Sequence, residues 1–167
     1  IWEQFMRKKE TTSLPYPECL KTLNDKLHGM RLGEIVLFTS GTGSGKSTVI
    51  KEIVLEILAK TTDMIGMVSL EESIGDSAEK FIGMQLRKNL VSNKVTEAEM
   101  YTAHQQVFGD ERLILLDHQG SVGDESLIDK LEHLALMGCK YIILDHITIA
   151  VSEGAKGRTG NKAVDSV

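Results

Sequence analysis

Hydrophobic and polar residues follow two different periods along this chain. Short continuous apolar runs, which are typical of strands buried in a sheet, occur at residues 35–38, 64–70, 113–116 and 141–144. Segments with an apolar residue every three or four positions, which are typical of amphipathic helices, occur at residues 20–27, 50–58, 78–90, 96–108 and 124–137. Because the two kinds of segment alternate, the pattern predicts an α/β fold with a mainly parallel sheet flanked by helices.

The apolar run at residues 35–38, which we predict to be the central strand, leads into a glycine-rich turn with the sequence SGTGSGKS at residues 40–47. Glycines let the backbone wrap closely around an anion, and the helix that follows presents the positive end of its dipole to the same anion. A strand, a turn of this kind and a helix predict a phosphate loop that binds a nucleoside triphosphate. The predicted binding residues are Gly41, Thr42, Gly43, Ser44, Gly45, Lys46, Ser47 and Thr48.

Two side chains of this turn have distinct predicted roles. Lys46 is expected to reach the β- and γ-phosphates, and the Ser47 hydroxyl is expected to bind a magnesium ion that bridges them. The full motif has glycine where this chain has Ser40, so the first half of the loop is expected to differ slightly in shape. The alternative is a solvent-exposed Gly/Ser turn, which the flanking strand and helix patterns disfavour.

An acidic pair follows the apolar run at residues 64–70. Ligands of open α/β sheets bind at the carboxyl ends of the strands, and a carboxylate there can orient and deprotonate a water that attacks the γ-phosphate. Glu71, which is nearest the strand end, is therefore the predicted general base, whereas Glu72 is predicted to cap a helix or to form an ion pair. The alternative is that these acids only open the next helix, since acids suit a helix N-terminus.

A second acidic strand end is found at Asp145, which follows the apolar run at residues 141–144. An acid in this position is the usual partner of a phosphate loop, and Asp145 is predicted to hold the magnesium ion through water. The stretch after Val151 is rich in glycine and in basic residues. Its cations Lys156, Arg158 and Lys162 are either part of a solvated loop or contacts for single-stranded DNA.

Composition narrows the classes of protein that fit. The chain of 167 residues is 41% hydrophobic, which predicts one domain with its own core, and its net charge of −5 means that any contact with nucleic acid must be local. No apolar run approaches the roughly 20 residues of a membrane span, and the two cysteines lie far apart without a metal-binding spacing. Residues 1–22 are predicted to be an amphipathic arm and linker, and residues 23–167 an ATPase core that is part of a longer chain.

The series of motifs resembles one family. The loop at residues 41–47, the sequence LEES at residues 70–73 and the sequence ILDHI at residues 143–147 look like the helicase domain of podovirus-type bifunctional primase-helicases. Twinkle and the DnaB-like replicative helicases are more distant relatives. The resemblance implies a RecA-like fold, a ring that is usually a hexamer, and ATP or dTTP bound between neighbouring subunits. It also implies that Glu71 is the catalytic glutamate and Asp145 the magnesium aspartate.

By the same resemblance, the partners are single-stranded DNA in the central channel, further copies of the chain, and a replicative polymerase and primase. No membrane is involved, and the implied location is the cytoplasm, or an organelle matrix for a Twinkle-like protein. The family's γ-phosphate sensor and arginine finger have no candidate here, so we expect the front part of a helicase core. The alternatives are a RecA-type ATPase of recombination or regulation without unwinding activity, and a nucleotide-binding assembly module without turnover.

Overall fold

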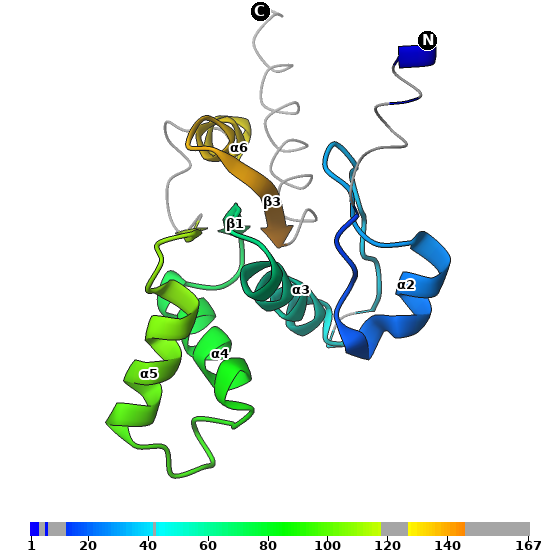
Figure 1. Cartoon of the computed structure of the whole chain (residues 1–167). Coiled ribbons are helices and arrows are strands. Elements are labelled where there is room, and N and C mark those ends of the chain that lie inside the picture. Colours follow the sequence, from blue (N-terminus) through cyan, green and yellow to red (C-terminus); the bar gives the residue numbers. More distant parts are fainter. Residues whose placement is uncertain (4–5, 7–12, 42, 118–126, 146–167) are drawn as a thin grey trace, which may run out of the picture.

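The computed structural model of this chain describes residues 1–3, 6, 13–41, 43–117 and 127–145. In the described part of the chain, each strand is preceded by one or more helices (Figure 1). In chain order, the elements are η1 (Glu18–Leu20), α2 (Lys21–Leu27), α3 (Lys46–Lys60), β1 (Met64–Ser69), α4 (Ile74–Leu86), α5 (Glu97–Phe108), β2 (Leu113–Asp117), α6 (Leu127–Leu136) and β3 (Cys139–Asp145).

The strands form a parallel three-stranded sheet in the order β2-β1-β3. In the register of the sheet, Ser69 at the end of β1 lies opposite both Asp117 of β2 and Asp145 of β3. All three carboxyl ends therefore meet at one edge, as parallel strands require. The predicted α/β fold with a parallel sheet and flanking helices is confirmed.

Helices cover both faces of this sheet (Figure 1). Ile65 and Met67 of β1 belong to a core cluster that also contains apolar residues of α3, α4 and α5. Val68 belongs to a second cluster with Leu134 of α6, which lies on the other face. This division follows from the strand itself, because successive side chains of a strand point to opposite faces.

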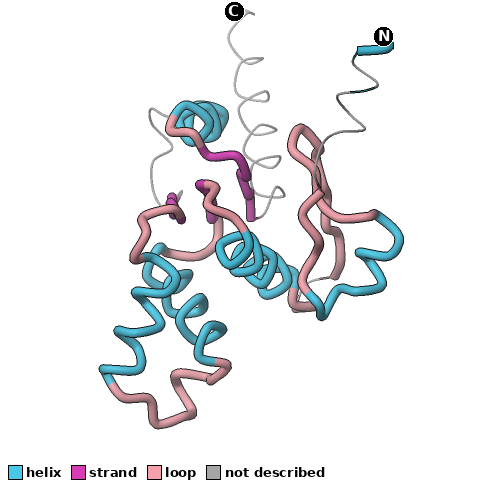
Figure 2. Tube along the Cα trace, in the orientation of Figure 1, coloured by secondary structure: helices cyan, strands magenta, loops and turns pink. Residues whose placement is uncertain are grey.

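The prediction of a central strand at residues 35–38 is wrong. This segment is part of the loop between α2 and α3 (Figure 2), and the side chains of Ile35 and Leu37 are 100% and 72% exposed. The central strand is instead β1, whose two edges are already taken by β2 and β3. A strand persists only when its backbone groups pair with a neighbour, and an apolar run alone does not supply that partner.

The predicted helices are present, with some shifted ends. Helix α4 begins at Ile74, four residues before its predicted start, because the Ser73 hydroxyl caps it by accepting a hydrogen bond from the Asp76 N–H. It ends before Arg87, which adopts a left-handed conformation. Helix α5 begins with the predicted capping box of Thr96 and Glu99. The predicted start of α6 lies outside the described residues.

The segment at residues 14–30 packs onto the core through several of its apolar side chains. Leu14 and Met30 exchange backbone hydrogen bonds in an isolated antiparallel bridge, and the side chain of Tyr16 is buried. Most of the predicted amphipathic arm lies outside the described residues, although the Trp2 side chain is described and exposed.

No helix in the described part of the chain combines the length and the apolar character needed to cross a membrane.

Candidate functional site

The glycine-rich loop leads directly into α3, as predicted. Gly43 and Gly45 have positive φ angles of 75° and 87°, a conformation that favours glycine, and Gly45 is the N-cap residue of the helix. The first backbone N–H groups of α3 have no partner within the helix and lie at the loop. An anion at this end would meet those N–H groups and the positive end of a 15-residue helix.

Side chains of the glycine-rich loop donate hydrogen bonds to backbone carbonyls of the same loop. The Lys46 ammonium donates hydrogen bonds to the carbonyl oxygens of Ser40 and Gly41, at 2.9 and 3.0 Å. The Ser44 hydroxyl donates to the Gly41 carbonyl at 2.7 Å and also contacts the Ser40 hydroxyl. Ser40, which replaces the first glycine of the motif, therefore contributes its side chain to the shape of the loop.

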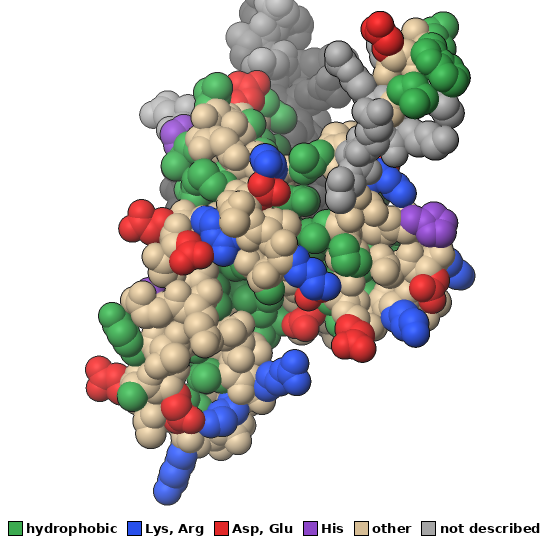
Figure 3. Space-filling model, in the orientation of Figure 1, with side chains coloured by type: hydrophobic (Ala, Val, Ile, Leu, Met, Phe, Trp, Pro, Cys, Tyr) green, Lys and Arg blue, Asp and Glu red, His purple; other side chains and the backbone are tan. Residues whose placement is uncertain are grey.

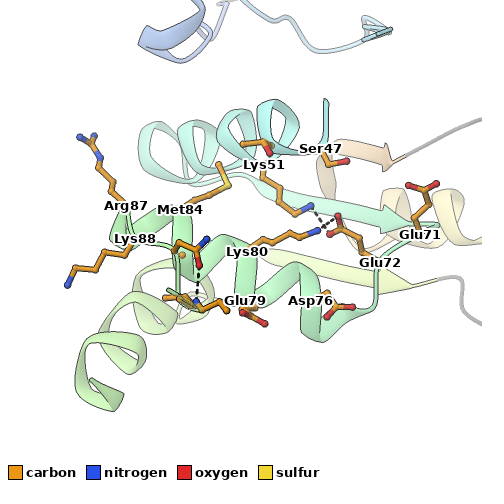
Figure 4. Close-up of a pocket in the computed structure, with 15 residues that line it drawn as sticks. Ser47, Lys51, Glu71, Glu72, Asp76, Glu79, Lys80, Met84, Arg87 and Lys88 are labelled. Atoms are coloured by element: carbon orange, nitrogen blue, oxygen red, sulfur yellow. Dashed lines mark hydrogen bonds and ion pairs between the residues drawn. The ribbon is translucent and has the colours of Figure 1, made fainter. Parts of the chain in front are cut away.

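A cleft of about 740 Å³ lies beside α3 and α4 (Figure 4). Ser47 and Thr48 line it from the first turn of α3, and Glu71 and Glu72 line it from the turn that follows β1. Its volume is within the range of small-molecule sites. The cleft thus brings the predicted magnesium-binding hydroxyl and the predicted general base into one site, whereas Lys46 and Asp145 are not among its lining residues.

The two adjacent acids point in different directions (Figure 4). Glu72 turns toward α3 and α4, where Lys51 and Lys80 donate to its two oxygens at 3.0 and 2.5 Å and the Ser77 hydroxyl donates at 3.2 Å. Burial opposes the charged form of Glu72, but the hydrogen bonds and charges of Lys80 and Lys51 outweigh it and lower the pKa of this carboxyl. The predicted ion-pairing role of Glu72 is confirmed.

The sequence analysis missed the three residues that hold Glu72, which are Lys51, Ser77 and Lys80. Lys51 is the more deeply buried of the two lysines. Its side chain is 1% exposed, and its ammonium lies 5.9 Å from the centre of the Phe81 ring. A signal was present in the sequence, because Lys51, Val54 and Leu58 share the helical spacing of a buried face. A lysine within such a face needs a partner, since lysine is almost never fully buried unpaired.

Asp145 ends β3, at the same edge of the sheet as the Glu71 turn. Its backbone carbonyl accepts a hydrogen bond from the Leu70 N–H at 2.7 Å, which ties the two strand ends together. Asp117 occupies the corresponding end of β2. Within the described ranges, no three His, Cys, Asp or Glu residues form a group that could hold a metal ion by themselves. A magnesium ion bound by the Asp145 carboxylate and the Ser47 hydroxyl would need further ligands, such as phosphate oxygens and water.

The predicted DNA-binding residues Lys156, Arg158 and Lys162 lie outside the described residues, as does Thr42 of the loop. On the face of the molecule seen in Figure 3, basic and acidic side chains are interspersed. That face shows no broad basic surface of the kind that binds nucleic acid at many points. A local DNA contact therefore remains a prediction.

Comparison with known proteins relates the chain to a phage replication protein. The chain is similar to the DNA helicase/primase of Enterobacteria phage T3, with 31% identity over 157 residues. The match covers 90% of this chain and 28% of the phage protein, so the chain spans just over a quarter of that relative. No family profile matches the chain. The predicted resemblance to primase-helicases is confirmed, since this stretch of sequence is related to part of a DNA helicase/primase.

Proposed function

We propose that this helicase/primase-related domain binds a nucleoside triphosphate with magnesium and hydrolyses it as part of a DNA helicase. One observation carries the proposal. Ser47, at the start of the helix that follows the glycine-rich loop, and Glu71, at the end of the central strand, line the same cleft. A phosphate-binding helix end and a carboxylate beside it are the two parts that hydrolysis of a γ-phosphate requires.

Binding begins at the loop in this proposal. The β- and γ-phosphates take the place of the Ser40 and Gly41 carbonyls as partners of the Lys46 ammonium. The exchange is favourable because a hydrogen bond between an ammonium and a phosphate is charge-assisted on both sides and is stronger than one to a neutral carbonyl. The backbone N–H groups at the start of α3 supply the remaining donors.

Hydrolysis then depends on Glu71. Its carboxylate accepts a proton from a water as the water oxygen bonds to the γ-phosphorus, and the bond from that phosphorus to the β–γ bridging oxygen breaks to release the diphosphate. The Ser47 hydroxyl and, through water, Asp145 would hold a magnesium ion, which neutralises charge on the phosphates. The confirmed role of Glu72 as an ion-pairing acid supports the choice of Glu71 as the base.

The wider activity is part of the same proposal. The relative is named as a DNA helicase/primase, which supports a role in DNA replication. We propose a ring of identical subunits, usually a hexamer, that moves along single-stranded DNA and separates the duplex. Lys156, Arg158 and Lys162 would contact the strand, and a primase and a replicative polymerase would be its partners.

The test compares Glu71→Gln with Glu72→Gln in the full-length protein. We expect Glu71→Gln to keep nucleotide affinity while turnover at saturating nucleotide falls by about 100-fold or more, as for a lost general base. Wild-type turnover in Glu71→Gln would show that the base is wrongly assigned. Strand displacement on a forked duplex, measured in parallel, separates a helicase from a RecA-type ATPase without unwinding. Nucleotide binding without any turnover would indicate an assembly module.

A further inference from the structure

We propose that Lys51 is a positioning residue for this hydrolysis: by holding Glu72, it sets the place of the neighbouring Glu71 relative to the phosphate-binding end of α3. The inference rests on the proposed function and adds to it a residue that does not itself touch the substrate. Lys51 acts through Glu72, and the two side chains join α3 to the turn that follows β1.

The first support is the burial of Lys51. Only 1% of its side chain is exposed, and its ammonium is 3.0 Å from the Glu72 carboxylate. Transferring an ammonium from water to such a site is unfavourable unless a partner compensates, and the compensation is sensitive to geometry. The Phe81 ring near the ammonium leaves it little freedom to choose another partner.

The second support is that Glu72 is held from two helices. Lys51 belongs to α3, whereas Ser77 and Lys80 belong to α4, and all three donate to the same carboxylate. Beneath this group, the buried hydroxyls of Ser69 and Ser77 lie 3.4 Å apart and join the end of β1 to α4. Glu72 therefore has a defined position relative to both helices.

The third support is the spacing along α3. Ser47 and Lys51 are four residues apart, so they lie on one face of the helix, separated by about 6 Å along its axis. Both line the cleft (Figure 4). Glu71 and Glu72 are adjacent, which places their Cα atoms about 3.8 Å apart. The distance between the phosphate end of α3 and the catalytic carboxylate is thus set through one helical turn, one ion pair and one peptide unit.

This arrangement can be distinguished from an ion pair that serves stability alone. A buried ion pair is weak evidence for stability, because replacing both partners with neutral groups is often harmless, whereas removing one partner leaves an unpaired charge. A stability role predicts that a neutral pair behaves like the wild type. A positioning role predicts that a neutral pair folds well but hydrolyses slowly, because a misplacement of about 1 Å can reduce the rate by up to about 100-fold.

The experiment uses the full-length protein with Lys51→Met, Glu72→Gln and the double variant. The matched control is Lys60→Met, which removes another lysine of α3 whose partner is Glu56, at the far end of the helix. We expect the double variant to melt near the wild-type temperature and to bind nucleotide within about threefold of it, while turnover at saturation falls about tenfold or more. Amide hydrogen exchange over residues 70–73 should become faster in the double variant and stay unchanged in Lys60→Met.

Wild-type turnover in the double variant, or a loss no larger than that of Lys60→Met, would overturn the proposal. If the wild-type protein itself hydrolyses no nucleotide, the proposed function fails, and hydrogen exchange then decides the remaining claim. Unchanged exchange over residues 70–73 in the double variant would show that Lys51 does not anchor the turn. Faster exchange confined to that segment would show that it does.

Discussion

Two lysines of one helix illustrate how surroundings decide what the same side chain can do. The Lys46 ammonium donates hydrogen bonds to two backbone carbonyls of an exposed loop. The Lys51 ammonium is buried against a carboxylate. A neutral carbonyl is readily exchanged for another acceptor, whereas separating a buried charge from its counter-charge is costly. Lys46 is therefore free to move to a ligand, and Lys51 is not.

Replacing Lys46 with alanine should weaken nucleotide binding by about tenfold or more, because it removes a charge-assisted contact to the phosphates. Isothermal titration calorimetry with the magnesium nucleotide measures the change. Lys60→Ala is the control, since it removes a lysine from the opposite end of the same helix. Equal affinities for wild type and Lys46→Ala would contradict the assignment of the loop.

At the scale of the elements, one glycine controls how closely α6 packs on the sheet. Gly66 lies in the middle of β1, and a Cβ atom there would be 2.7 Å from the methyl groups of Leu134. Leu134 is fully buried, so its side chain would have to shift within the core to admit that atom. The contact between β1 and α6 thus depends on the absence of a side chain at this position.

Gly66→Ala should therefore destabilise the protein, by about 1–3 kcal/mol for an overpacked core. The control is Gly75→Ala in the first turn of α4, where the nearest atom to a new Cβ is 3.8 Å away, so the substitution is tolerated. Urea denaturation followed by circular dichroism compares the two variants. Similar midpoints would mean that α6 adjusts its position over the sheet.

The ionisation of Glu99, at the start of α5, makes the stability of the fold depend on pH. A hydrogen bond from Lys88, followed by those from the backbone and side chain of Thr96, lowers the pKa of Glu99 to about 2. Because the folded-state pKa is depressed, this group stabilises the fold above the pKa of the unfolded chain, near 4.5, and the contribution is lost as pH falls toward 2.

In Lys88→Met the pKa of Glu99 should rise toward its ordinary value, so the stability that this group loses in acid should be smaller and the loss should be complete at a higher pH. A titration of the Glu99 side-chain carboxyl by NMR measures the shift directly. Lys140→Met, which removes the partner of Asp63, is the matched control and should leave Glu99 unchanged. A Glu99 pKa that is the same in Lys88→Met would assign the effect to Thr96 alone.

For the whole molecule, the sign of the charge limits how DNA can bind. With a net charge of −5, the chain as a whole repels a phosphate backbone, so binding must rely on a few local cations. The proposed cations Lys156, Arg158 and Lys162 alternate with glycines that let the chain follow a backbone.

Replacing these three cations with alanine in the full-length protein should weaken single-stranded DNA binding and reduce the salt dependence of its affinity. Each lost phosphate contact lowers the magnitude of the slope of log affinity against log salt by about 0.7. The slope of the triple variant should therefore be smaller in magnitude than the wild-type slope by about 2. Fluorescence anisotropy at several salt concentrations measures the slope. An unchanged slope would assign these residues to a solvated surface.

The sequence by itself determined the features that arise from neighbouring residues. The glycine-rich loop and the start of α3, the capping box of Thr96 and Glu99, and the alternation of helices with parallel strands all follow from local backbone preferences and from hydrophobic periodicity. The strand ends that carry Glu71 and Asp145 were predictable for the same reason. These interactions span a few residues, so a short stretch of sequence contains their cause.

Only the tertiary structure decided which strand is central and which lysines pair with Glu72. An apolar run at residues 35–38 has the composition of a strand, but a strand also needs a paired neighbour, and in the described part of the chain this run lies in a loop outside the sheet. Lys51 and Glu72 are 21 residues apart, and nothing in either local sequence specifies that they meet. Strand pairing and the burial of a charge depend on residues that folding brings together, and for that reason periodicity alone did not reveal them.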